Sequence, residues 1–298
     1  MELYQNKVEH FTKVFNKINK RYNSISVLRL LSVFLCLFML FYYIKTNQLF
    51  YVGFAFLSFV GFLILMRIHS KLSIEKELTK AILKINENEI AFLKREKLPF
   101  ENGIEFNDFH HPYAYDLDIF GEHSLFQNLN RTATFIGKKT LAEKLLILFP
   151  NEAILENQEA IHELNKKIDW RQEFHALAIV SNDSKSSYES LLHWNSFKKN
   201  TLPKVLIALS VILPTLFLGF LIAYIITSKT ILLSYLTYVF IFNMMVMGKS
   251  FKRIHSEIAK ADNVDKIIKQ YSLLVEKIEK ETFQSKKLID LQKQLFFK

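Results

Sequence analysis

The stretches VLRLLSVFLCLFMLFYYI (Val27–Ile44) and LFYVGFAFLSFVGFLILM (Leu49–Met66) decide how this chain must fold. The first carries a single charged residue, Arg29, and the second carries none. A helix of such a stretch is roughly 27 Å long, close to the ~30 Å hydrocarbon core of a bilayer. Because only Lys45–Gln48 separate the two stretches, the chain has to reverse there. The sequence therefore predicts a transmembrane helical hairpin at residues 27–66.

A second apolar block, at residues 197–247, repeats this design. It contains the runs Val205–Ile226 and Ile231–Met247, which are joined by a short link. Pro203 suits a helix start, and Pro214 is expected to kink the third span. Uncharged runs of this length, dense in Phe and Leu, are rare in soluble cores. We therefore expect a second hairpin and four spans in total.

The composition favours helices throughout. The 298 residues include only 7 Gly and 5 Pro. So few turn formers argue against a β-sandwich and against a Gly-rich nucleotide-binding α/β fold. The single cysteine, Cys36, excludes a disulfide within the chain and a cysteine-based metal site. The predicted fold class is an all-α integral membrane protein.

Basic residues indicate which side of the membrane each segment faces. The formal net charge is +10, and each predicted hairpin tip has only one lysine, whereas the other ends of the spans have several. These flanking residues are Lys13, Lys17, Lys20, Arg21, Arg67, Lys71, Lys76, Lys80, Lys198, Lys199, Lys204, Lys249, Lys252 and Arg253. By the positive-inside rule, the N-terminus, the middle segment and the C-terminus face the cytoplasm. We expect the bacterial inner membrane as the location and the lipid bilayer as a partner.

Three segments outside the spans have helical apolar patterns. Residues 1–26 predict an amphipathic helix that either lies on the anionic inner leaflet or packs on the rest of the protein. Residues 67–99 predict a long helix ended near Pro99. Residues 248–298 predict a lever or coiled-coil helix, ~75 Å long if continuous, which could support a homodimer. Its pattern reaches Lys298 without a stop signal, and we expect a truncated or split protein.

The middle segment, residues 100–196, differs in kind. Its helix signals are short and are separated by breaks, which indicates a small core of short antiparallel helices. In chain order we expect a helix over Leu125–Asn130 capped by Asp118 or Ser124, a break at Thr132–Gly137, a helix over Lys138–Phe149 ended by Pro150, and a helix capped by Asn151 that continues to about Val180.

This segment also carries a motif, SLF-x2-LNRT-x-T-x2-G at Ser124–Gly137. The motif resembles the core (lever) domain of the MutS mismatch-repair family, most of all that of membrane-embedded MutS-like proteins. The resemblance covers about 70 residues well. It implies structural roles for Asp116, Asp118, Phe120, Gly121, Ser124, Leu125, Phe126, Asn130, Arg131, Thr132, Gly137, Trp170 and Arg171.

In the membrane-embedded MutS-like proteins that the motif resembles, the resemblance implies hydrophobic hairpins beside the core and a C-terminal ATPase domain after it. This chain departs from the pattern at Asn157, where the family usually has an Arg. It has no counterpart of the mismatch-reading N-terminal domain, and it lacks the nucleotide-binding domain. The resemblance therefore implies a MutS-type ATPase domain as a partner, either in cis or from a split gene.

No catalytic, cofactor or metal site is predicted, and we expect this chain not to be an enzyme. Gly137-Lys138-Lys139-Thr140 and Gly248-Lys249-Ser250 imitate phosphate loops but lack the Gly-rich turn between a strand and a helix. Nitrogen and oxygen ligands also gather without a recognised metal spacing, at His110, His111, Asp116, Asp118 and His123.

DNA remains a possible partner. Six basic residues, here called the core cations, have the charge to meet phosphates: Lys138, Lys139, Lys144, Lys166, Lys167 and Arg171. They alternate with acids such as Glu143 and Glu163. A solvated helix surface is therefore preferred over a DNA-binding face.

The expected function is that of the non-catalytic N-terminal half of a membrane-anchored MutS-like protein. In this interpretation an ATPase domain outside the chain tilts the lever helix and moves the core, which contacts DNA or a membrane partner. The alternative is a membrane scaffold that dimerises through its long helices and has no DNA role.

Overall fold

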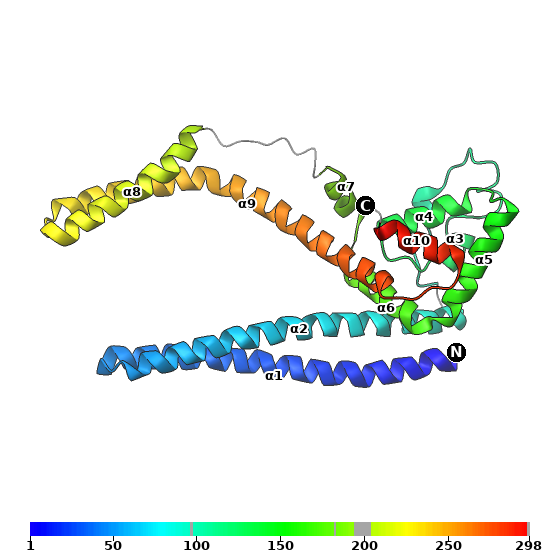
Figure 1. Ribbon diagram of the computed structural model, residues 1–298, viewed down its shortest axis with the longest axis horizontal. Helices are drawn as coiled ribbons and strands as arrows, with labels where there is room; N and C mark the ends of the chain where they lie inside the picture. Colours follow the sequence, from blue (N-terminus) through cyan, green and yellow to red (C-terminus); the bar gives the residue numbers. More distant parts are fainter. Residues whose placement is uncertain (96–97, 182, 194–203, 297–298) are drawn as a thin grey trace. The chain divides into compact units, whose positions relative to one another are not determined.

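The computed structural model describes residues 1–95, 98–181, 183–193 and 204–296, leaving out some side chains after residue 189 (Figure 1). The regular elements in these ranges are helices, so the all-α prediction is confirmed for them. Lys198, Lys199 and Pro203, which the sequence places before the third span, lie outside the described residues. Two compact units make up the chain: Met1–Ser184 with Gln270–Lys298, and Lys185–Lys269.

The first unit begins with a long antiparallel pair, α1 (Glu2–Thr46) and α2 (Phe50–Leu93). Each helix continues without a break from a polar half into an apolar half, because no Gly or Pro interrupts either junction. The chain reverses at Asn47, which caps α1 in the left-handed region with φ of 54°. The residue 1–26 segment packs on the protein, since Phe11 lies against the buried cluster around Ile82 and Ala176.

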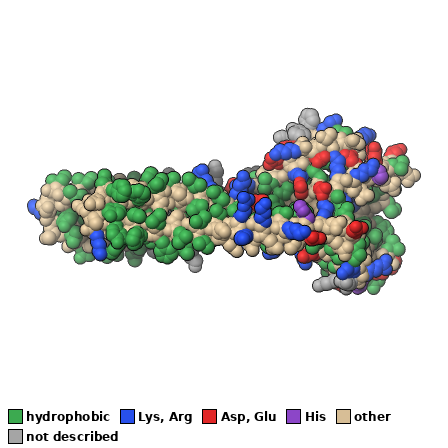
Figure 2. Space-filling view, turned by 90° about the horizontal axis from the view of Figure 1, so that it is seen from below, with side chains coloured by type: hydrophobic (Ala, Val, Ile, Leu, Met, Phe, Trp, Pro, Cys, Tyr) green, Lys and Arg blue, Asp and Glu red, His purple; other side chains and the backbone are tan. Residues whose placement is uncertain are grey.

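The apolar halves of α1 and α2 turn large side chains outward. Leu37 is 58% exposed and Phe56 is 68% exposed, and Figure 2 shows a broad hydrophobic surface at that end. Contiguous apolar surface of this size is rare on soluble proteins, and a helix that is apolar all round belongs in a core or a membrane. Together with Ala208–Thr227, α1 and α2 are long and apolar enough to cross a membrane.

The second unit contains α7 (Lys185–His193), α8 (Lys204–Thr227) and the larger part of α9 (Ile231–Glu279). The reversal between α8 and α9 repeats the device of the first hairpin, because Ser228 has φ of 52° and its N–H donates to the Tyr224 carbonyl. Phe220 stacks on Tyr235 across this turn. The apolar part of α9, Ile231–Met245, is shorter than these three candidate spans, so among the described residues three helices, and not the expected four, are long and apolar enough to cross a membrane.

The small core of the first unit forms around Phe126, which is fully buried. It contains a 3-10 turn (Ile104–Phe106), α3 (Leu125–Leu129), α4 (Phe135–Leu145), α5 (Asn151–Lys166) and α6 (Ile168–Ser181). Gly103 has φ of +68°, and a Cβ there would stand 2.6 Å from the Phe126 ring. Only glycine allows that close approach.

Several predicted helix boundaries in this core are wrong. Ser124 does cap α3, accepting the Gln127 N–H at 3.2 Å, whereas Asp118 sits in a left-handed turn. The next helix starts at Phe135 instead of 138, because Thr134 caps it and Gly137 falls inside its first turn. Asn151 is the first residue of α5 rather than its cap, and the helix stops at Lys166 before α6 begins.

Residues 248–298 do not form one continuous helix, so the length of ~75 Å that continuity would give does not apply. The helix α9 ends at Glu279, and a separate α10 (Lys286–Phe296) follows a short turn. The Glu163 carboxylate on α5 accepts the N–H groups of Gln284 and Ser285 at 2.7–3.1 Å. The Gln292 amide donates to the Ile278 and Glu281 carbonyls at 2.8 Å, which satisfies the end of α9. Tertiary contacts therefore end the helix where no Gly or Pro does. The helix α2 ends at Leu93, before Pro99.

Candidate functional site

The first unit contains an open, largely apolar cavity of about 1220 Å³, here called the junction cavity. Its walls come from α2, the Arg131–Gly137 stretch, α6, the end of α9 and α10. Apolar side chains of the C-terminal helices form much of the lining, among them Leu274, Ile278, Leu288, Leu291 and Leu295. The cavity thus lies where the long helices meet the small core.

The motif residues divide into two groups in the structure. Five line the junction cavity although they come from two separate stretches: Arg131, Thr132, Gly137, Trp170 and Arg171. Phe120, Ser124, Phe126 and Asn130 are buried within the small core, Gly121 is half-buried, and Asp116, Asp118 and Leu125 are exposed.

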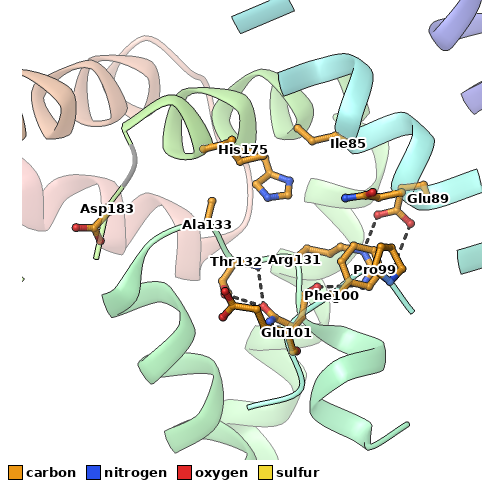
Figure 3. Close-up of a pocket in the computed structure, with 13 residues that line it drawn as sticks. Ile85, Glu89, Pro99, Phe100, Glu101, Arg131, Thr132, Ala133, His175 and Asp183 are labelled. Atoms are coloured by element: carbon orange, nitrogen blue, oxygen red, sulfur yellow. Dashed lines mark hydrogen bonds and ion pairs between the residues drawn. The ribbon is translucent and has the colours of Figure 1, made fainter. Parts of the chain in front are cut away.

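Arg131 joins the motif to α2. Its Nε donates to Glu89 Oε1 at 2.5 Å and its Nη2 donates to Oε2 at 3.2 Å, a two-pronged ion pair (Figure 3). The guanidinium lies 3.5 Å from the centre of the Phe100 ring and 4.7 Å from that of Phe92. The planar guanidinium can make both kinds of contact at once, because it forms the ion pair in its own plane and stacks on aromatic rings with its faces. A lysine would supply the charge without this geometry.

The loop around Arg131 is held by its neighbours in the motif. The Asn130 Oδ1 accepts both the N–H and the hydroxyl of Thr132, at 3.0 and 2.7 Å, and its amide donates to the Glu101 carbonyl. The Gly137 N–H donates to Thr134 Oγ1 at 3.1 Å, and a Cβ on Gly137 would come within 2.9 Å of that oxygen. The Asn-Arg-Thr run therefore presents Arg131 to α2 in a fixed direction.

His175 lies beside this ion pair. It lines a smaller pocket of about 260 Å³ together with Glu89 and Arg131 (Figure 3). Burial lowers the pKa of His175 to about 4; the nearby Glu89 carboxylate opposes this shift and Arg131 adds to it. The imidazole is consequently neutral at pH 7.

A buried amide pair ties α6 to α2. The Gln172 amide donates to Asn86 Oδ1 at 2.8 Å, and Asn86 returns a longer contact at 3.3 Å. Lys7 of α1 adds a hydrogen bond to Gln172 Oε1 at 3.1 Å and an ion pair to Asp169. One set of polar contacts thus joins α1, α2 and α6.

Trp170 ties α6 to the C-terminal helices. Its ring stacks on Phe174 with centroids 5.2 Å apart and meets Phe283 edge-on at 5.7 Å. Its indole N–H reaches the Lys277 carbonyl at 3.4 Å, close to the end of α9. Arg171, next in sequence, is exposed at the cavity rim.

Carboxylates neutralise several of the core cations. Partial burial disfavours the charged form, but ion pairs with Glu101 and Glu105 raise the pKa of Lys138 above its ordinary value. Lys139 faces Glu143 at 3.7 Å, and Lys167 pairs with Glu281 at 2.5 Å. Lys144, Lys166 and Arg171 are exposed. The six residues are spread over α4, α5, the turn after it and α6.

The structure brings together no metal ligands from the groups named above. Among the described residues, no three or more His, Cys, Asp or Glu side chains are placed to hold an ion. His111 instead contacts the Leu146 carbonyl at 3.0 Å, and His110 lies beside Asp108. Gly137 lies in the first turn of α4 and Gly248 lies within α9.

Sequence reasoning missed Glu89, His175 and the Asn86–Gln172 pair. The pair did leave a signal, since Asn86 follows Ile82 and Ile85 on the apolar face of its helix. Glu89 and His175 left none, because their partners are more than 40 residues away in the chain.

Comparisons with protein-family models, with curated proteins and with solved structures find no match for this chain.

Proposed function

We propose that this chain is a membrane-anchored coupling module with a MutS-like core. Four spans in two hairpins hold it at the bacterial inner membrane, with its termini and core in the cytoplasm. The core and the C-terminal helices transmit movement between an ATPase domain of the MutS type and the membrane hairpin. The chain itself carries out no catalysis.

The Arg131–Glu89 ion pair carries this proposal. Arg131 belongs to the motif that resembles the MutS core, and Glu89 lies on α2, the helix that continues into an apolar candidate span. A tilt of the core therefore has a short, charged connection to the membrane helix. The buried Asn86–Gln172 pair, one turn away on α2, supplies a second connection.

The junction cavity supports coupling between the C-terminal helices and the core. Its walls include the end of α9 and the α10 residues Leu288, Leu291 and Leu295. The core contacts the turn between these two helices through Trp170 and Glu163. Well-packed interfaces move between discrete arrangements, whereas a cavity of about 1220 Å³ leaves room for α10 and α9 to shift. We propose that lever movement opens and closes this cavity.

Hydrogen exchange tests the coupling. The full chain in nanodiscs is compared with Arg131→Lys and Glu89→Gln, using Lys139→Gln as a control that changes charge on α4 without touching α2. Both junction variants are expected to speed exchange in residues 85–93 and 125–137, with residues 27–66 unchanged. Exchange indistinguishable from that of the control would refute the coupling.

Cysteine labelling tests the topology. In a Cys36→Ser background, Gln48→Cys and Lys229→Cys place a thiol at each predicted hairpin tip, and Lys139→Cys places one on the core. An impermeant maleimide added to intact cells is expected to label the two tips, and the core only after permeabilisation. Labelling of the core in intact cells would overturn the proposed orientation.

DNA contact and the ATPase partner are tested separately. Duplex DNA is titrated onto the full chain in nanodiscs at several salt concentrations, alongside a variant with all six core cations changed to Gln. Affinity that falls with salt and is lost in the variant supports DNA as the output.

The coding sequence after codon 298 is expected to contain a Gly-x4-Gly-Lys-[Ser/Thr] region, in frame or shifted.

The second candidate is a scaffold that dimerises through its long helices. The helix α10 favours it, because Leu291 and Leu295, one turn apart, keep 49% and 40% of their surface exposed at the mouth of the junction cavity. Crosslinking through Lys293→Cys in native membranes distinguishes the two. A dimer that forms with no DNA affinity in the titration favours the scaffold.

A further inference from the structure

A pocket of about 540 Å³ lies between α1 and α2, outside the site described above. Here called the basic pocket, it has a charged rim and an apolar floor. The rim consists of Lys17, Lys20 and Arg21, which share one face of α1 because they are three and four residues apart. The floor consists of Ile25 on α1 with Ile68 and Leu72 on α2.

The basic pocket sits just beyond the apolar ends of the candidate spans. The first span begins at Val27 and the second ends at Met66, so the floor residues lie within two turns of these ends. Arg21 is ~9 Å and Lys17 ~15 Å along the helix from Val27. A headgroup layer is ~5–8 Å thick on each side of the hydrocarbon. The Arg21 end of the rim, whose side chain is long, therefore reaches the level of lipid phosphates.

Acidic residues are missing from this part of the sequence. Residues 10–74 contain no Asp or Glu, although they include Lys17, Lys20, Arg21, Arg67 and Lys71. The rim of the basic pocket has no carboxylate partner among the described residues, in contrast to Lys138 and Lys167 in the core. In Figure 2, Lys and Arg side chains gather where the hydrophobic surface of the hairpin ends. Any carboxylate or phosphate that pairs with this rim therefore comes from outside the described part of the chain.

The pocket fits an anion that is also apolar. A free phosphate would use the cations alone and leave Ile68 and Leu72 against water. A phospholipid would place its phosphate against the rim and the upper part of an acyl chain on the floor. The position of the pocket at the end of the apolar surface decides between these two sources, because a bilayer brings both parts of the lipid to it.

We propose that the basic pocket binds one anionic phospholipid of the inner leaflet through its phosphate and acyl chain. This inference rests on the proposed membrane orientation of the hairpin. The bound lipid places a negative charge against the rim, fixes the depth of α1 and α2, and sets the point from which the polar halves of both helices project towards the core.

Native mass spectrometry of the detergent-solubilised full chain tests this site. Phosphatidylglycerol and phosphatidylcholine are offered together, and one phosphatidylglycerol per chain is expected to be retained. The variant Lys17→Gln/Lys20→Gln/Arg21→Gln is expected to lower that retention about tenfold or more, since each basic residue near a membrane surface favours anionic lipid. The control Lys80→Gln/Lys84→Gln/Lys293→Gln makes the same change of charge elsewhere and is expected to retain the lipid.

A second variant separates a defined pocket from general attraction of charge. Ile68→Trp fills the floor but keeps all three cations, and it is expected to lower phosphatidylglycerol retention as well. Water-soluble glycerol phosphate at millimolar concentration is expected not to displace the lipid. Equal retention by the triple variant and its control, no effect of Ile68→Trp, or displacement by glycerol phosphate would each overturn the proposal. The cysteine labelling described above reports the topology independently, so a failure of the lipid site is distinguishable from a failure of the orientation.

Discussion

The apolar half of the α1–α2 hairpin and the small core around Phe126 bury side chains in opposite ways. In the hairpin, large apolar side chains point outward, as Phe56 does with 68% of its surface exposed. In the core, Phe126 is fully buried and Ser124 is 1% exposed beside it. The hairpin has few polar contacts between its helices, such as the Ser58 hydroxyl donating to the Ser32 carbonyl, whereas side-chain hydrogen bonds hold the core together.

This contrast reflects two different origins of stability, the apolar surface of the hairpin and the specific packing of the core. A lipid-facing helix satisfies its own backbone and needs only enough apolar residues, so many single substitutions leave it unchanged. The core has to fit one arrangement of rings, caps and amides, so a single change is felt. The coupling proposed above depends on the second kind of region, which makes stability measurements on the core the best way to examine it.

The largest effect is expected for Phe126→Ala. Removing a fully buried ring leaves a cavity, and we expect a loss of about 3–5 kcal/mol in the free energy of unfolding of the core. Phe56→Ala on α2 is the matched control, since its ring is exposed, and it is expected to leave the core unchanged. Trp170 fluorescence during denaturation, in a Trp194→Phe background, measures both. Equal effects of the two substitutions would remove the contrast between the regions.

His175 provides the next largest effect, and it depends on pH. Its pKa falls from 6.5 to about 4 on folding, chiefly through burial. Between these values the unfolded chain binds a proton that the folded chain does not, so stability is full above pH 6.5 and is lost as the pH falls towards 4. The loss attributable to His175 is about 3 kcal/mol at pH 4.

The same unfolding measurement on His175→Gln isolates this contribution. The variant lacks the titrating group, so the difference between its stability and that of the wild type is expected to change between pH 6.5 and 4. His110→Gln, whose side chain is 98% exposed, is the control and is expected to follow the wild type. A pH-independent difference for His175→Gln would show that its imidazole is accessible to water.

The two regions also differ in how far the sequence predicts them. Hydropathy alone placed the α1–α2 reversal at the right residues, and local capping identified Ser124. The break after Glu279 was missed because Glu163, which holds the turn before α10, lies more than 120 residues away in the chain. The start of α4 was missed because Gly137 was taken as a breaker, while Thr134 caps the helix ahead of it. Of the candidate site, the motif predicted Arg131 and Trp170 but not what they contact.

The Asn86–Gln172 pair tests whether the core and α2 act as one body. Changing either residue to Leu leaves the other buried without its partner, and each single variant is expected to cost about 1–3 kcal/mol. The double variant Asn86→Leu/Gln172→Leu is expected to cost less than the sum, because neither polar group remains unpaired. Additive losses in the Trp170 unfolding measurement would mean that the two amides do not interact in solution.

The smallest effect on stability is expected at the turn between α9 and α10, where the core residue Glu163 accepts hydrogen bonds from the backbone of the turn. Partial burial alone would raise the pKa of Glu163, but the hydrogen bonds that its carboxylate accepts from the N–H groups of Ser285 and Gln284 lower the pKa below its ordinary value. Glu163→Gln weakens this cap, and we expect a loss of about 1 kcal/mol together with faster proteolysis at residues 280–285. Glu159→Gln, one turn earlier on α5 and exposed, is the control. Glu163 belongs to the core, whereas the turn belongs to the C-terminal helices. Unchanged proteolysis in Glu163→Gln would therefore show that the sequence of the C-terminal helices alone ends α9 at Glu279. The core would then have no part in positioning α10.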